Sequence, residues 1–163
     1  MKKLIIALAF LFVATTTFCQ NNCPKITKLI NDLSHGSLSQ EFTTTKFTTS
    51  EDFDAYIAAT QLDGAVRCYV QDVFNKQMYV AEFGTAELSS SANLETSFDN
   101  ISSMLNTCLG TNFVHGQVKA NSPVVKGIQY EGRGTYQNIK ISLMVVNNPS
   151  SRKFEFFMRI TKD

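Results

Sequence analysis

Residues 138–161 are NIKISLMVVNNPSSRKFEFFMRIT, a segment in which apolar and polar side chains alternate on both sides of a turn. A period of two places one set of side chains on one face of a strand. Pro149, inside the turn sequence 147–151, cannot continue either strand. The segment therefore predicts two antiparallel strands with one buried face. Its alternating apolar residues are Ile139, Ile141, Leu143 and Val145, then Phe154, Phe156, Met158 and Ile160.

Other segments rich in β-branched and aromatic residues extend this prediction to more strands. Gly132-Arg133-Gly134 indicates a turn, and the short Asn75-Lys76 indicates a hairpin between two neighbouring strands. The expected strands are residues 42–48, 65–74, 77–85, 112–119, 124–131, 135–146 and 153–161.

Two segments carry an apolar stripe at helical spacing. The longer one, residues 92–109, ends at Gly110. The shorter one begins at Pro24, which suits the first position of a helix, and ends near Gly36, which tolerates the left-handed conformation. Each helix needs a surface on which to bury its stripe. The two stripes are Leu94, Phe98, Ile101, Leu105, Cys108 and Leu109, and Ile26, Leu29, Ile30 and Leu33.

A third, short helix is expected to begin near Ser50. Glu51 and Asp52 would then lie in its first turn, where the helix macrodipole favours acidic groups. Tyr56 and Ile57 would lie on its apolar side with Phe53, and Asp63-Gly64 would end the segment with a turn.

These elements predict the α+β class. We expect one antiparallel sheet of about five to seven strands with two amphipathic helices packed on one face, since that arrangement buries every apolar stripe. Both halves of the chain show a helix followed by strands, so a duplicated unit is the alternative. No residue-level repeat at a fixed period supports that alternative.

The first nineteen residues have the composition of a secretory signal peptide. Lys2 and Lys3 precede an apolar run that is too short to span a bilayer, and small and polar residues follow it. We expect cleavage before Gln20, leaving residues 20–163 as a single domain. The ending Phe18-Cys19-Gln20 is similar to the ends of bacterial signal peptides. Acylation of Cys19, which would make a lipid-anchored envelope protein, is the alternative.

Export would place the domain in the periplasm or outside the cell. Removing residues 1–19 leaves 144 residues with 13 basic and 14 acidic side chains. A nearly neutral domain lacks the excess of positive charge that neutralises nucleic-acid phosphates. No nucleic-acid partner is therefore expected. Residues 20–163 contain no run of 18 apolar residues, so no transmembrane segment is expected there either.

Three cysteines remain after Gln20, and an oxidising compartment permits one bridge between them. Cys23 and Cys108 are expected at helix ends, so we predict a bridge between them. Cys68 falls on the same side of a predicted strand as Val66 and Val70 and is predicted to be a buried free thiol. Three free thiols are the alternative.

Few residues suit catalysis. No motif for a phosphate cradle, a metal helix or a nucleophile elbow is present, so we expect neither a cofactor nor a metal. Of the two histidines, His35 is predicted to cap a helix, and His115 to lie exposed in a strand. A Cys68–His115 nucleophile pair would require both groups to meet.

The sequence favours a non-catalytic binding or interaction protein of the bacterial envelope, with a protein or small-ligand partner. Aromatic residues fall on both faces of several strands, among them Tyr69 and Tyr79 of the hairpin and Phe157. Tyrosine and arginine together are typical of contact surfaces. Tyr130, Arg133 and Tyr136 therefore form the predicted contact patch. The alternative is that these aromatic residues only cover a second layer or the edge of the sheet. A small secreted hydrolase, or an inhibitor of one, is the alternative function.

Overall fold

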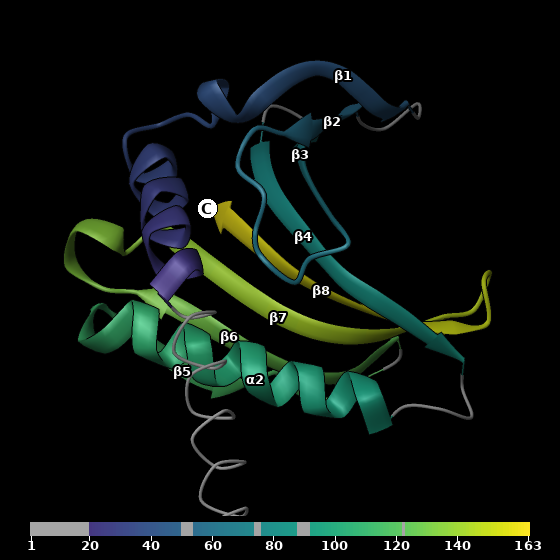
Figure 1. Cartoon of the computed structure of the whole chain (residues 1–163). Helices are drawn as coiled ribbons and strands as arrows, with labels where there is room; N and C mark the ends of the chain where they lie inside the picture. The colour runs from purple at the N-terminus through teal and green to yellow at the C-terminus, as the bar shows by residue number, and fades with distance from the viewer. Residues whose placement is uncertain (1–19, 50–53, 74–75, 88–91, 122) are drawn as a thin grey trace, which may run out of the picture.

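The computed structural model describes residues 20–49, 54–73, 76–87, 92–121 and 123–163 (Figure 1). The predicted signal peptide, residues 1–19, lies outside these described residues. So do Ser50, Glu51, Asp52 and Phe53, on which part of the predicted short helix depends.

The described strands form one antiparallel sheet in the order β1-β2-β3-β4-β8-β7-β6-β5 (Figure 1). This confirms the predicted α+β class, although the sheet has eight strands, more than the expected five to seven. The strands are β1 (Phe42–Thr49), β2 (Asp54–Ala58), β3 (Arg67–Val73), β4 (Lys76–Glu87), β5 (Phe113–Gln117), β6 (Val124–Gly132), β7 (Ile139–Asn148) and β8 (Lys153–Lys162).

The alternating segment forms β7 and β8, as predicted. Ile141 is opposite Ile160 and Leu143 is opposite Met158, so the two apolar sets share one face. All four of these side chains are buried in the hydrophobic core. We call this side of the sheet the covered face.

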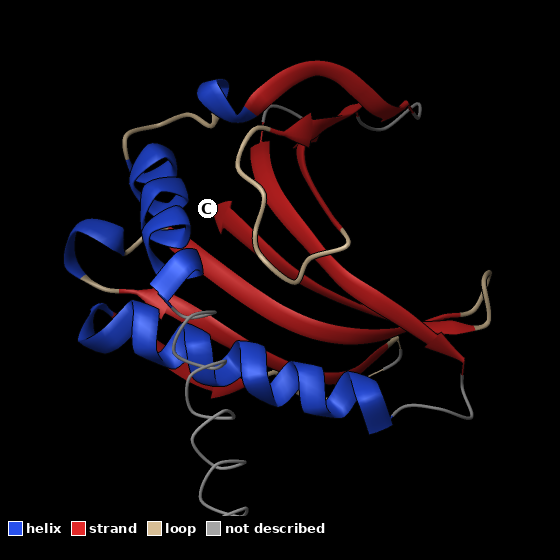
Figure 2. Ribbon diagram, in the orientation of Figure 1, coloured by secondary structure: helices blue, strands red, loops and turns tan. Residues whose placement is uncertain are grey.

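Two long helices lie on the covered face (Figure 2). One spans residues 20–34, and the other is α2 (Ala92–Leu109), which packs over β4 and β7. Both predicted stripes enter the core, including Leu29 and Leu105. Pro24 is not the first helical residue, because the described chain is already helical at Gln20. Three short 3-10 turns are Ser39–Glu41, Gly110–Asn112 and Gly134–Tyr136.

The helix over residues 20–34 ends as expected. Gly36 has a φ of 113°, and its amide donates to the Leu33 carbonyl at 3.0 Å. The ring Nδ1 of His35 lies 2.7 Å from the carbonyl oxygen of Asn31 and so caps a carbonyl of the last turn. His35 therefore has a structural role at this helix end.

Other boundaries differ from the prediction. Residues 54–58, expected to be helical, form strand β2 between β1 and β3, because pairing on both sides outweighs the helical spacing of Tyr56 and Ile57. Val73 pairs with Lys76, so β4 begins one residue earlier than predicted. Val66 precedes β3 and is 75% exposed, whereas Cys68 and Val70 are buried.

The two halves share one topology. Each consists of a helix followed by four antiparallel strands, and the halves meet where β4 pairs with β8. This architecture agrees with the alternative of a duplicated unit at the level of topology. A disulfide between Cys23 and Cys108 also joins the halves, as predicted, with a Cα–Cα distance of 5.0 Å.

Candidate binding surface

The predicted contact patch does not form one exposed surface. Tyr130 is only 1% exposed, because it is opposite Ile141 and shares the covered face. Its hydroxyl donates to the Ser102 carbonyl at 3.3 Å. Burial raises the pKa of Tyr130, and a separate hydrogen bond between its hydroxyl and the Ser102 hydroxyl, at 3.3 Å, opposes that shift. Tyr130 thus belongs to the core beneath α2.

The other two patch residues, Tyr136 and Arg133, differ in their exposure to solvent. Tyr136 is half-buried, stacks on Phe113 with ring centroids 5.8 Å apart, and donates from its hydroxyl to Asn31 Oδ1 at 2.9 Å. Arg133 is exposed. Of the three predicted contact residues, only Arg133 offers its side chain to solvent.

The residues of the imagined nucleophile pair are far apart in the sheet. Cys68 lies in β3, His115 lies in the edge strand β5, and four strands separate these two strands. Cys68 is a buried free thiol, as predicted, and its sulfur accepts from the Leu62 amide at 3.4 Å. Burial raises the pKa of the thiol, which disfavours the nucleophilic thiolate. His115 is exposed and lies 5.6 Å from the Tyr130 ring, centroid to centroid.

One carboxylate is buried, and its partners make it structural. Glu41 accepts from the Thr60 amide at 2.7 Å and from the Thr60 hydroxyl at 2.9 Å. Lys28 forms an ion pair with the same carboxylate. Within the described ranges, no group of three or more histidine, cysteine and acidic side chains is placed to hold a metal ion. None of the described helices is long and apolar enough to cross a membrane.

A different surface combines aromatic and arginine side chains. Two large apolar residues, Val80 of β4 and Phe157 of β8, are 2% and 8% exposed but do not belong to the core cluster. Val80 is opposite Tyr69 and Arg159, and Phe157 is opposite Glu82 and Met144. Because cross-strand partners share a face, these residues lie on the side opposite the two helices. We call it the open face.

Side chains of the sheet itself cover the apolar centre of the open face. The guanidinium carbon of Arg159 lies 4.6 Å from the Phe157 ring centroid, and that of Arg67 lies 5.7 Å from the Tyr69 centroid. Arg67 also donates to Glu82 Oε2 from Nε at 3.2 Å. Burial, reinforced by the nearby Glu82 carboxylate, raises the pKa of Tyr69. The phenol therefore stays protonated.

This arrangement offers a partner two aromatic rings together with the exposed guanidinium of Arg159. Aromatic rings and guanidinium groups supply large contact area together with directed hydrogen bonds. In the sequence, Tyr69 and Phe157 stand out as aromatics on the side opposite an apolar stripe. Val80 and Arg159 carry no such signal, because only the strand register brings them next to Tyr69 and Phe157.

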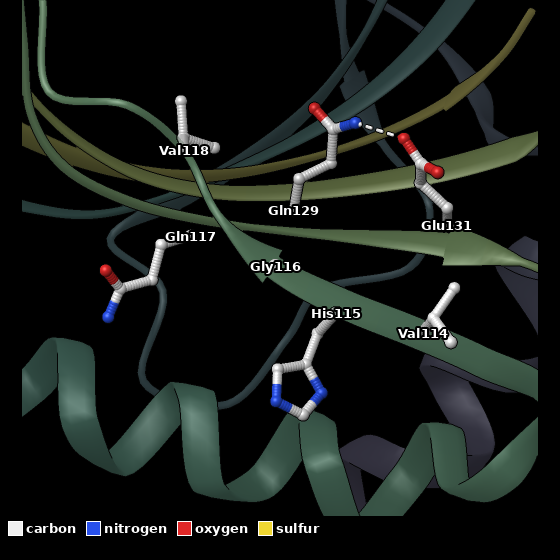
Figure 3. Close-up of a pocket in the computed structure, with 7 residues that line it drawn as sticks. All are labelled: Val114, His115, Gly116, Gln117, Val118, Gln129 and Glu131. Carbon is white, nitrogen blue, oxygen red and sulfur yellow. Dashed lines mark hydrogen bonds between the residues drawn. The ribbon is translucent and has the colours of Figure 1, made fainter.

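A pocket of about 360 Å³ lies beside the edge strand β5. Residues 114–118 form one wall, and Gln129 and Glu131 of β6 form another (Figure 3). Gln129 Nε2 donates to Glu131 Oε1 at 2.8 Å, so the two polar side chains are already paired. His115 points toward α2, away from these two side chains (Figure 3).

Comparison with known proteins adds no assignment to this geometry. Neither the protein-family models, nor the curated proteins, nor the solved structures contain a match to this chain.

Proposed function

We propose that this protein is an exported, non-catalytic binding domain of the bacterial envelope whose open face contacts a partner protein. One observation carries the proposal: Arg67 and Arg159 stack on Tyr69 and Phe157 over the buried Val80, on the sheet face opposite both long helices. This surface takes the place of the predicted patch of Tyr130, Arg133 and Tyr136, in which Tyr130 is buried.

A partner can bind to the open face at a low cost in conformational entropy and in hydration. The two aromatic rings have few torsions to immobilise, and the sheet already fixes their backbone. The Arg159 guanidinium, which stacks on Phe157, is weakly hydrated, so a carboxylate or carbonyl of a partner can accept from it with little loss of hydration. The Arg67 guanidinium is already paired with Glu82. Contact energy in protein interfaces is concentrated on such tyrosine, tryptophan and arginine side chains.

Export rests on two separate observations. The Cys23–Cys108 disulfide is typical of an oxidising compartment such as the periplasm or the cell exterior. The first nineteen residues have the order of charges and apolar residues that signal peptides share. Residues 20–163 would then be the mature protein.

Binding is tested by capture from an envelope extract with the wild-type protein and two variants. Arg159→Ala removes a guanidinium from the open face, and Arg133→Ala removes an exposed arginine elsewhere. We expect Arg159→Ala to weaken capture of a specific protein about tenfold or more, and Arg133→Ala to leave it unchanged. Thermal denaturation of each variant checks that it is folded.

Two results would contradict the proposal. One is equal capture of the same proteins by the wild type and by Arg159→Ala. The other is loss of capture with Arg133→Ala alone, which would return the contact surface to the neighbourhood of the Gly132-Arg133-Gly134 turn.

A further inference from the structure

The two edge strands of the sheet differ in how they are protected. The pairing of β1 with β2 shifts register on each side of Lys46, and Lys46 forms an ion pair with Asp54 at 2.8 Å. Bulges and lysines at an edge oppose pairing with another strand. At the other edge, β5 pairs with β6 in unbroken register and carries no lysine, arginine, acidic residue or proline. The β5 edge thus lacks these protective features.

The backbone groups that β5 presents outward follow from its ladder. Arg133 donates its amide to the Asn112 carbonyl at 2.8 Å, and Val118 donates to the Gly127 carbonyl at 2.9 Å. In an antiparallel ladder alternate residues exchange both bonds with the partner strand. Residues 112, 114, 116 and 118 therefore bond toward β6, while 113, 115 and 117 direct their amide and carbonyl groups away from the sheet.

On one side of β5 an exposed valine side chain lies next to the empty space beside a glycine. Val114 is 38% exposed, and it shares one side of the strand with Gly116, two positions along. A β-carbon added at Gly116 would meet no atom within 4 Å, so the space above this glycine is empty. Figure 3 shows Val114 and Gly116 as neighbouring positions of the same exposed strand beside the pocket.

We propose that a second copy of this chain pairs with β5 edge to edge, antiparallel, about a two-fold axis at His115. In that register the outward groups of His115 in the two copies exchange hydrogen bonds. Val114 of each copy then lies opposite Gly116 of the other copy and fills the space above it. Because the axis is two-fold, this contact occurs twice.

The geometry sets the strength of the association. Stable interfaces bury about 1,600 Å² in total, and two strands of five residues bury less than that. Residues 114–117 of β5 are exposed, so the edge is accessible to another strand. The dimer is therefore reversible and concentration-dependent, and its two sheets join into one without covering either open face.

Sedimentation velocity over a range of concentrations tests the dimer. The wild-type protein shifts toward the dimer as concentration rises. Val114→Lys and Gly116→Lys each place a charge on the edge, and both variants sediment as monomers. Val66→Lys is the matched control, since Val66 is also exposed but lies outside β5, and it dimerises like the wild type.

A cross-linking experiment tests the register. Positions 114 and 116 of opposite copies form a non-hydrogen-bonded pair, with Cα atoms about 4.5 Å apart, which suits a disulfide. A mixture of the Val114→Cys and Gly116→Cys variants therefore forms a disulfide-linked dimer under mild oxidation, and each variant alone forms far less.

The dimer proposal is overturned by a wild-type protein that sediments as a monomer at every concentration. A dimer that persists in Val114→Lys, or that is lost equally in Val66→Lys, overturns it as well. Equal cross-linking of the mixture and of either variant alone refutes the register. Val114 and Gly116 lie on the edge strand β5, whereas the residues of the proposed contact surface lie on β3, β4 and β8, so these readouts are independent of the capture experiment.

Discussion

Met158 and Phe157 are neighbours in β8, and both are buried, but different groups cover them. Met158 belongs to the core with the two helices above it, whereas Phe157 lies on the open face beneath the guanidinium of Arg159. A helix excludes water from one face through apolar packing. On the other face, side chains of the sheet shield one another and keep charged groups in solvent. Low exposure therefore has two causes here: covering by the helices, or covering by other side chains of the sheet. Only covering by the helices identifies a residue as part of the core.

The largest expected effect concerns the Cys23–Cys108 disulfide, which links the two helices on the covered face. Replacing Cys23 and Cys108 together by serine should lower the free energy of unfolding by about 2–5 kcal/mol, since the bridge closes a loop between residues 85 positions apart. Urea unfolding measures the change. Adding reductant should destabilise the wild type but not the double variant. Equal stability of the two proteins would show that packing alone holds the helices in place.

A matched pair of methionines tests the two faces directly. Met158→Ala, on the covered face, should cost about 2–5 kcal/mol, because the surrounding core cannot close the cavity. Met144→Ala, opposite Phe157 on the open face, should cost about 1 kcal/mol or less. Urea unfolding of both variants provides the comparison. Equal losses would mean that both faces contribute alike to the core.

The covered face should also make stability depend on alkaline pH. Burial raises the pKa of Cys68 above the 9.0 of an exposed thiol, and it raises the pKa of Tyr79 as well. The unfolded chain then loses these protons before the folded one, so their stabilisation is complete below pH 9.0 and is lost as the pH rises further.

Cys68→Ala should accordingly flatten part of this decline, by up to about 1.4 kcal/mol per pH unit. Unfolding curves of the wild type and the variant at about pH 7 and about pH 10 measure it. The same slope in both proteins would contradict the assigned effect of the thiol.

The smallest effect is expected for Arg159→Ala. Its side chain is exposed and stacks on Phe157, so removing it should change the free energy of unfolding by less than about 1 kcal/mol. Thermal or urea unfolding can establish this. A loss as large as that of Met158→Ala would show that the open face stabilises the fold, and it would weaken the case for binding there.

Periodicity in the sequence predicted those elements whose pattern has a single interpretation. Ile139 to Val145 alternate strictly, and α2 keeps one apolar stripe along its whole length, so both form as expected. The positions of Cys23 and Cys108 at predicted helix ends also predicted the disulfide correctly. Tyr56 and Ile57 fit helical spacing and a strand equally well, and pairing partners distant in the sequence decided between the two.

The candidate surface was less accessible to sequence reasoning. Alternation separates the two sides of a strand but does not say which side the helices cover, and for this reason Tyr130 was expected at a surface. Arg159 lies next to Val80 only through the register of β4 with β8, which the sequence does not encode locally. The exposed edge at β5 likewise depends on strand order.

The position of β8 has a consequence for how the protein is made. Residues 153–162 are the last described strand along the chain, yet β8 lies in the middle of the sheet between β4 and β7. While the chain emerges during synthesis, β4 has no strand to occupy its inner edge until these residues arrive. Until then the first half exposes the unpaired edge of β4, a state prone to aggregation. Loss of the segment after Ser151 would remove β8 and so prevent assembly of both halves.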